Sequence, residues 1–169
     1  MINDPNTIFN IRELEIVSAL QTKRSETITD LLNATLLSVK TVVPIDCQIM
    51  KPRLLQDKLT LHYGVFIGMT GDIQGKLILT GDPKTFGLIG QSMFGMPLEG
   101  EMLLSFSGEL GNMIAGGLST NIVKNGIDMN ITAPTMMQGD TKLAGYKQAL
   151  EVPVEFENIG QLNVFLLID

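Results

Sequence analysis

Residues 105–116 read Ser-Phe-Ser-Gly-Glu-Leu-Gly-Asn-Met-Ile-Ala-Gly, and they lie inside a long helical pattern. At roughly 100° per residue, one side of this helix carries polar or small residues within about 60° of one another: Ser105, Glu109, Asn112 and Gly116. The more apolar residues gather on another face: Phe106, Leu110, Met113, Ile114 and Gly117. We therefore expect the carboxylate of Glu109 and the amide of Asn112 to face outward together.

The outward-facing residues offer three complementary functions to a partner. Glu109 can bind a cation such as a lysine, and Asn112 offers a donor and an acceptor to a water molecule. Gly116, one turn further on, removes side-chain bulk and permits close approach. Polar outward positions are also ordinary on helices, so the pair taken alone is more typical of a solvated helix face than of a catalytic pair.

Composition narrows the class of protein. The chain has 169 residues, of which 44% are hydrophobic, enough to bury one substantial core. Its formal charge of −6 argues against general nucleic-acid binding and favours a protein partner. The single cysteine, Cys47, excludes an internal disulfide, and no Cys/His cluster has zinc-ligand spacing. We expect neither a metal nor a cofactor of its own.

The chain also lacks the signals of export and membrane insertion. Its first residues, Met-Ile-Asn-Asp-Pro, have neither the basic region nor the apolar core of a signal peptide. No apolar run reaches the roughly 18 residues that span a bilayer. We expect a soluble, cytoplasmic protein that does not bind membranes.

The N-terminal part of the sequence predicts an arm, a helix and three strands. Ile11, Leu14 and Val17 form an amphipathic stripe, so residues 1–24 are interpreted as a separate arm or as the start of a longer helix. A helix beginning near Ser25 ends before Pro44. Three strand-like runs follow, at about residues 46–51, 59–68 and 73–79. A tight turn joins the last two.

The C-terminal part repeats this order. Asp82-Pro83 starts a short helix that ends near Gly95. The long helix then runs from about Glu99 or Glu101 to Asn125, with Gly126 suited to the C′ position. Three more predicted strands finish the chain: about residues 128–136, 149–157 and 161–168.

A local sequence match supports an internal duplication. Residues 45–52, Ile-Asp-Cys-Gln-Ile-Met-Lys-Pro, can be laid on residues 127–134, Ile-Asp-Met-Asn-Ile-Thr-Ala-Pro. Each segment follows a long helix and precedes a hairpin. We therefore predict an α+β fold, an α/β sandwich with long helices packed on an antiparallel sheet, in one domain over residues 25–169. Its pseudo-symmetric halves are about 25–95 and 96–169.

The first half carries a weaker counterpart of the polar motif. Glu26-x3-Asp30-x2-Asn33 has the right spacing, while the offset of the repeated segment instead places Thr27 opposite Glu109 and Asp30 opposite Asn112. Neither registration restores a Glu/Asn pair. Because aspartate is one methylene shorter than glutamate, we interpret this half as a scaffold whose site is absent or degraded.

Other residues have simpler interpretations. His62 lies in an alternating strand with no acidic or cysteine partner nearby in sequence and is interpreted as structural. Asp128 and Asp140 are interpreted as turn residues. The ten methionines are scattered and are interpreted mainly as core filling.

The pattern Ser105-x3-Glu109-x2-Asn112, followed by Pro134, resembles the signature of the CheX/CheC/FliY phosphatases of bacterial chemotaxis. The resemblance covers roughly residues 25–169 and implies a CheC-like fold. A single good Glu/Asn pair looks more like CheX than like the two-site CheC or FliY members.

The resemblance implies a function and partners. A CheX-like protein would dephosphorylate the aspartyl phosphate of a CheY-like response regulator, with Asn112 orienting the water and Glu109 pairing with the regulator's lysine. The regulator would supply Mg²⁺, and Ser105 and Gly116 would contact it. The resemblance also implies a homodimer joined through sheet edges, for which we considered Leu59–Gly68 and Ala149–Glu157. The alternative is a non-catalytic CheC-like adaptor or flagellar-switch binding module.

Overall fold

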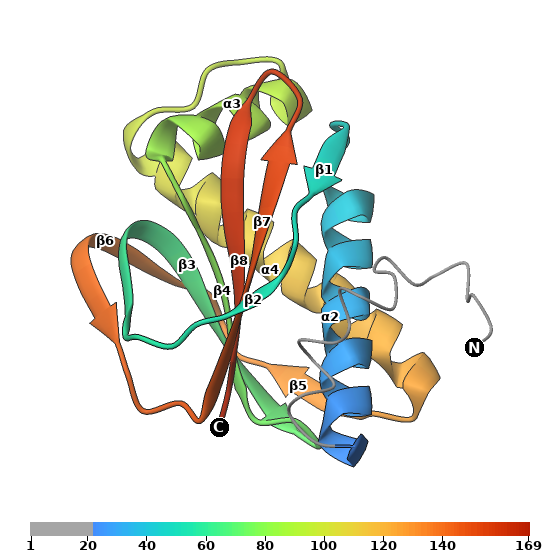
Figure 1. Ribbon diagram of the computed structural model, residues 1–169. Helices are drawn as coiled ribbons and strands as arrows, with labels where there is room; N and C mark the ends of the chain where they lie inside the picture. The colour runs from blue at the N-terminus through green and yellow to red at the C-terminus, as the bar shows by residue number, and fades with distance from the viewer. Residues whose placement is uncertain (1–21) are drawn as a thin grey trace.

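The computed structural model describes residues 22–169, in which three α-helices pack against one eight-stranded sheet (Figure 1). The helices are α2 (Thr22–Val42), α3 (Pro83–Phe94) and α4 (Gly100–Ile122), and a 3-10 turn, η1 (Val123–Asn125), follows α4. The predicted arm over residues 1–24, with its stripe of Ile11, Leu14 and Val17, lies almost wholly outside the described residues. None of the described helices is long and apolar enough to cross a membrane.

The sheet has a palindromic strand order. Its strands are β1 (Cys47–Ile49), β2 (Arg53–Leu54), β3 (Leu59–Gly71), β4 (Gly75–Gly81), β5 (Met129–Ile131), β6 (Thr135–Leu143), β7 (Gln148–Phe156) and β8 (Gly160–Ile168). They pair in the order β1-β7-β8-β4-β3-β5, with β2 also on β7 and β6 also on β3. If each strand of the first half is exchanged for its counterpart in the second half (β1 for β5, β2 for β6, β3 for β7 and β4 for β8), the same order results in reverse. The two halves are thus related by a pseudo-twofold arrangement centred between β4 and β8, as the sequence repeat predicted.

The repeating unit is a helix followed by four strands rather than three. The three-residue strands β1 and β5 lie at matching positions of the two repeated segments. Pro52 and Pro134 then interrupt pairing, because proline has no N–H to donate to a ladder. The single predicted strand over 128–136 is therefore wrong: β5 ends at Ile131 and β6 begins at Thr135.

The predicted edge strands lie inside the sheet. β3 has β4 on one side and β5 and β6 on the other, and β7 lies between β8 and the pair β1 and β2. The prediction that Leu59–Gly68 and Ala149–Glu157 form edges is therefore wrong. β3 is covered by β6, which was not expected beyond Met136 and which pairs with it from Thr135 to Leu143. β7 is covered by β1 and β2. The outer strands are the short β1 and β2 at one side and β5 and β6 at the other.

Helices α2 and α4 cover one face of the sheet and cross each other closely (Figure 1). At Gly117 of α4, an added Cβ would lie only 2.1 Å from Ser38 Oγ of α2, so only glycine permits this approach. Gly111 likewise allows Val65 of β3 to contact α4. Both helices bury their apolar residues in one core, including Leu31, Leu32, Leu36, Leu110, Ile114 and Leu118.

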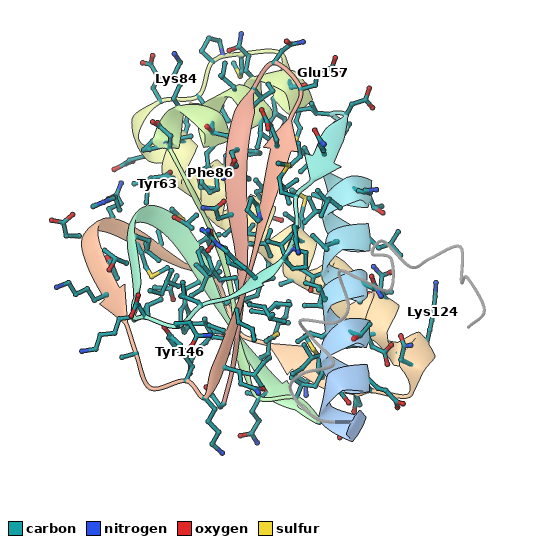
Figure 2. All side chains as sticks on the ribbon, in the orientation of Figure 1. Tyr63, Lys84, Phe86, Lys124, Tyr146 and Glu157 are labelled. Carbon is teal, nitrogen blue, oxygen red and sulfur yellow. The ribbon has the colours of Figure 1, made fainter. Side chains whose placement is uncertain are left out.

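Helix α3 has the termini that its sequence predicts. The side chain of Asp82 accepts a hydrogen bond from Lys84 N at 2.8 Å, and Pro83 occupies the first turn. Gly95 adopts a left-handed conformation at the C-terminus, φ 75°. Figure 2 shows Tyr63 and Phe86 beside each other between α3 and the sheet. Their rings pack edge-to-face, with the ring centroids 5.2 Å apart. The contact between Tyr63 and Phe86 thus packs α3 on the sheet.

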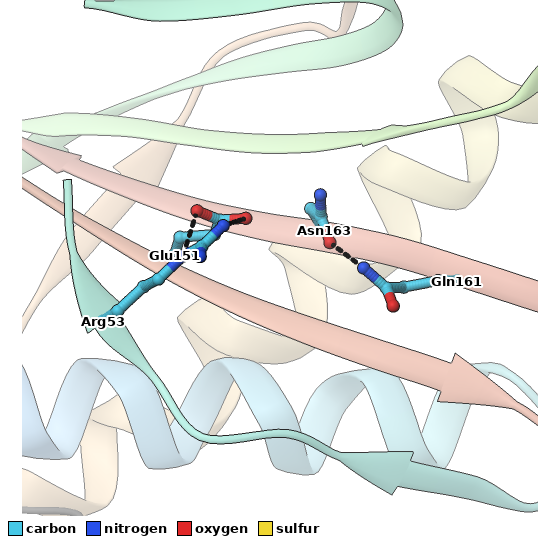
Figure 3. Close-up of polar contacts among 4 residues, drawn as sticks. All are labelled: Arg53, Glu151, Gln161 and Asn163. Atoms are coloured by element: carbon cyan, nitrogen blue, oxygen red, sulfur yellow. Dashed lines mark hydrogen bonds and ion pairs between the residues drawn. The ribbon is translucent and has the colours of Figure 1, made fainter. Parts of the chain in front are cut away.

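The outer face of the sheet carries a second, smaller apolar cluster that includes Leu61, Ile78 and Phe165. An ion pair closes one side of it: Arg53 of β2 donates two hydrogen bonds, of 2.8 and 2.9 Å, to the buried carboxylate of Glu151 on β7 (Figure 3). The hydrogen bonds that Arg53 donates to Glu151 raise the pKa of Arg53, which keeps its guanidinium charged. On the neighbouring strand β8, the side-chain amide of Gln161 donates a hydrogen bond to Asn163 Oδ1 at 2.8 Å.

Candidate functional site

Hydrogen bonds hold helix α4 to three neighbouring elements, β3, β5 and α2. Near its start, Tyr63 of β3 and Ser107 lie 2.8 Å apart through their hydroxyl oxygens. Further along, Ser119 Oγ donates to Met129 O of β5 at 3.0 Å, and the amide of Asn121 donates to Ala34 O of α2 at 3.2 Å. The helix is thereby fixed in position and rotation, which determines the side that it presents to solvent.

The solvent-facing side is the one that the sequence predicted. Ser105 and Glu109 are exposed, and Asn112 and Gly116 are half-buried. Within residues 26–169, neither the carboxylate of Glu109 nor the side-chain amide of Asn112 makes a hydrogen bond or an ion pair. Both groups therefore keep their full capacity for a partner or a water molecule.

The two adjacent glycines of this helix have different surroundings. Gly117 packs on Ser38, whereas a Cβ at Gly116 would meet nothing within 4 Å. Gly116 is therefore not required by packing within the described chain. Its position, one turn beyond Asn112, leaves an open and flat surface at that end of the site.

The proline of the motif lies beside the helix although it is distant in sequence. A Cβ added to Gly108 would lie 3.9 Å from Pro134 Cγ and 3.9 Å from Met136 Sδ. The connection from β5 to β6 is anchored at Thr132, whose hydroxyl accepts a hydrogen bond from Gly68 N at 2.8 Å. The fold thus brings the Pro134 segment next to the helical turn that carries Glu109.

The corresponding region of α2 differs in burial and charge. Asp30 and Asn33 are half-buried, and Thr27 lines a small cavity with Asp72 and Gln74. Burial first, and then the nearby Glu26 carboxylate, raise the pKa of Asp30. An acid whose charged form is disfavoured suits a cation anchor less well than the exposed Glu109 does.

Sequence reasoning missed an apolar groove beside Glu109. The groove has a volume of about 640 Å³ and is lined by Phe94, Met96, Leu98, Glu101, Met102, Ser105, Phe106 and Glu109. Met96 and Met102 are exposed, so their interpretation as core filling is wrong. A sequence signal did exist: Met102 precedes Ser105 by three residues and Glu109 by seven, which places it on the same helical stripe.

The interpretation of Asp140 as a turn residue is wrong, and strand pairing gives His62 a contact that its sequence neighbours did not show. Asp140 lies within β6, not in a turn, and its carboxylate is 2.6 Å from His62 Nδ1 of β3. His62 therefore has an acidic partner that only strand pairing brings close, and both side chains are exposed. Asp128 fits its predicted role, because it precedes β5 and its N–H donates to Asp72. Over residues 26–169, no group of three or more His, Cys, Asp or Glu side chains could hold a metal ion.

Comparison with known proteins assigns the family. The family described as chemotaxis phosphatase CheX matches residues 63–156, a segment that contains Glu109, Asn112 and Pro134. The chain belongs to the CheX family. Over 92 residues it is 37% identical to the CheY-P phosphatase CheX of Thermotoga maritima, a match that covers 52% of this chain and 59% of that relative.

Solved structures show that the fold is the CheC-like fold predicted from the motif. A CheC-like superfamily protein from Shewanella sp. PV-4 superposes with a TM-score of 0.72 and 24% identity, covering 83% of this chain and 97% of that one. A chain of the CheX-CheY-BeF3-Mg complex from Borrelia burgdorferi superposes with a TM-score of 0.69 and 22% identity, covering 84% of this chain and 97% of that one. Within this CheX fold, α4 is the helix that carries the Glu/Asn motif.

Proposed function

We propose that this protein is a phosphatase that hydrolyses the aspartyl phosphate of a CheY-like response regulator. One observation carries the proposal: Glu109 and Asn112 lie one turn apart on the exposed side of a firmly held helix, within the segment that matches the CheX family. The proposal includes a cytoplasmic location, as the regulator that serves as substrate requires.

The chemistry needs little from the phosphatase. In an aspartyl phosphate, water attacks phosphorus, the bond between phosphorus and the aspartyl oxygen breaks, and the aspartate carboxylate leaves. Because that leaving group is good, placing the water in line with the breaking bond is the main task left to the enzyme. No nucleophile on this chain is required.

The two side chains have separate roles in this proposal. The amide of Asn112 binds the attacking water, because its oxygen can accept a hydrogen bond from water and its nitrogen can donate one. The carboxylate of Glu109 pairs with a lysine of the regulator and fixes the docked orientation. Ser105 and Gly116, on the same side of α4, contact the regulator's surface.

The donor set of this chain does not suggest a metal ion of its own. One carboxylate and one amide project from α4 where Mg²⁺ in proteins usually has several oxygen ligands and the substrate's phosphate. We therefore propose that Mg²⁺ comes with the regulator, where it would neutralise charge on the phosphoryl group.

The proposal extends to a homodimer. β6 has a strand partner only on its β3 side within the described chain, so its other edge presents backbone donors and acceptors. Edge pairing of β6 with a second copy would satisfy these groups and continue the sheet.

A panel experiment tests the function. Receiver domains are phosphorylated with a small phosphodonor, and release of inorganic phosphate is measured with and without this protein. Catalytic acceleration with at least one receiver domain is the expected result. Binding to a phosphorylated receiver domain without acceleration would instead identify the alternative, a non-catalytic CheC-like adaptor or switch module.

A further inference from the structure

Three of the five large apolar side chains that are exposed among residues 26–169 surround one groove. Phe94 is 60% exposed, Met96 50% and Met102 56%, and all three line the groove beside Glu109. Exposed apolar residues that gather in one place, rather than scatter singly, mark an interaction surface.

The groove is a rigid feature of the fold. Its floor is formed by Leu98 and Phe106, which are 9% and 6% exposed. Phe94 packs edge-to-face on Phe106, with ring centroids 5.8 Å apart. At Gly90 of α3, an added Cβ would lie 2.3 Å from Leu98, so α3 approaches the groove floor as closely as glycine allows. The groove therefore exists before any partner arrives.

The groove is continuous with the Glu/Asn site. Met102, Ser105, Glu109 and Asn112 follow one another at helical spacing along α4, and Glu109 itself lines the groove. Met102 lies seven residues from Glu109, about 10 Å along the axis at about 1.5 Å per residue. A standard protein interface covers about 800 Å² on each partner, a circle of roughly 16 Å radius. A regulator centred on Glu109 and Asn112 therefore covers the groove.

We propose that this groove is the docking site for the receiver domain of the regulator, into which an apolar side chain beside its phosphorylated aspartate inserts. The inference rests on the phosphatase function proposed above and assigns the surface that determines affinity for the substrate. The carboxylates of Glu101 and Glu109 border the groove, so the matching receiver surface presents its apolar side chain between basic groups. Filling a preformed apolar pocket inside an interface provides affinity.

Steady-state kinetics separate docking from chemistry. With a phosphorylated receiver domain that the unaltered chain hydrolyses, Met102→Ser and Phe94→Ser are expected to raise KM about tenfold and to leave kcat within twofold. Met102→Ser is the cleaner variant, because Phe94 also packs on Phe106. Met50→Ser is the matched control: Met50 is also an exposed methionine, at 38%, but it lies beside β7 at the other side of the sheet. Its KM is expected to be unchanged.

Each other result overturns the inference in a distinguishable way. Normal kcat and unchanged KM in both groove variants would remove the groove from the interface and leave the phosphatase function intact. No hydrolysis of any receiver domain by the unaltered chain would overturn the function and this inference together. Light scattering identifies a third case: a dimer that Met102→Ser dissociates, with unchanged KM, would make the groove a contact between two copies.

Discussion

The hydroxyl of Tyr63 on β3 donates a hydrogen bond to Ser107 on α4, across 2.8 Å in the buried core. The direction follows from Ser107, whose own hydrogen is donated to Leu103 O at 2.8 Å. This bond fixes the height and rotation of α4 two residues before Glu109. The position of the candidate site thus depends on a polar contact inside the core.

Tyr63→Phe is expected to destabilise the protein by about 0.5–1.5 kcal/mol at pH 7, because one buried hydrogen bond is lost while the ring still packs on Phe86. Burial raises the pKa of Tyr63 above its usual value. The folded state therefore holds the phenol proton more tightly, and the stability that Tyr63 contributes is complete below about pH 10 and falls as pH rises above it. Urea unfolding at pH 7 and above pH 10 measures the difference in unfolding free energy between the unaltered protein and Tyr63→Phe. An equal difference at both pH values would contradict the prediction.

Asn112→Ala is expected to reduce turnover of a phosphorylated receiver domain on the order of 100-fold while leaving its binding within twofold, because the water loses its orienting group. Glu109→Ala is expected to weaken both binding and turnover, because the anchor to the regulator is lost. Both positions face outward, so unfolding free energies should change by about 0.5 kcal/mol or less.

Asn121→Ala serves as the matched control for that pair of variants. It makes the same change on the same helix, but the Asn121 amide donates to Ala34 O of α2. This variant should lose stability and keep its turnover. Full turnover in Asn112→Ala would refute the proposed mechanism.

Alanine substitutions at the two adjacent glycines of α4, Gly116 and Gly117, are expected to change stability in opposite directions. Gly117→Ala would place its Cβ 2.1 Å from Ser38 Oγ and 3.0 Å from Ser38 Cβ, so it should destabilise the protein by about 1–3 kcal/mol. Gly116→Ala meets no atom within 4 Å and should stabilise the helix by about 0.5–1 kcal/mol. Thermal unfolding measures both. If the regulator packs on Gly116, Gly116→Ala should also raise KM, and an unchanged KM would exclude Gly116 from the interface.

The double variant Asp30→Ala/Asn33→Ala is expected to retain nearly all phosphatase activity, because the shorter and partly buried aspartate is poorly placed as an anchor. Initial rates with a phosphorylated receiver domain test this, and circular dichroism checks the fold. If turnover per chain falls to half in a folded variant, α2 carries a second working site, as in CheC-like or FliY-like members.

Static light scattering is expected to give about twice the 18.4 kDa chain mass at micromolar concentration. The physical reason is the unpaired side of β6, since a second copy can satisfy its backbone groups. Amide hydrogen exchange in β6 should accelerate on dilution, while exchange in β4 and β8 should not. A monomer with unchanged β6 exchange would show that this edge is stable by itself.

Local sequence determined the helices, the duplication and the exposed motif. Asp82 and Gly95 specify the ends of α3 through short-range hydrogen bonds and a left-handed turn, which depend on neighbouring residues alone. The outward orientation of Glu109 and Asn112 follows from helical periodicity. These features need no knowledge of distant parts of the chain.

Tertiary structure alone decided which strands form the edges of the sheet and where the groove lies. β6, Thr-Met-Met-Gln-Gly-Asp-Thr-Lys-Leu, lacks a clear alternating pattern and is a strand because β3 supplies its hydrogen-bonding partners. His62 and Asp140 meet only through that pairing. The groove likewise joins Phe94 of α3 to Met102 of α4 through the close approach at Gly90. Contacts between residues far apart in sequence depend on how whole elements pack, and the local pattern of either element does not contain that information.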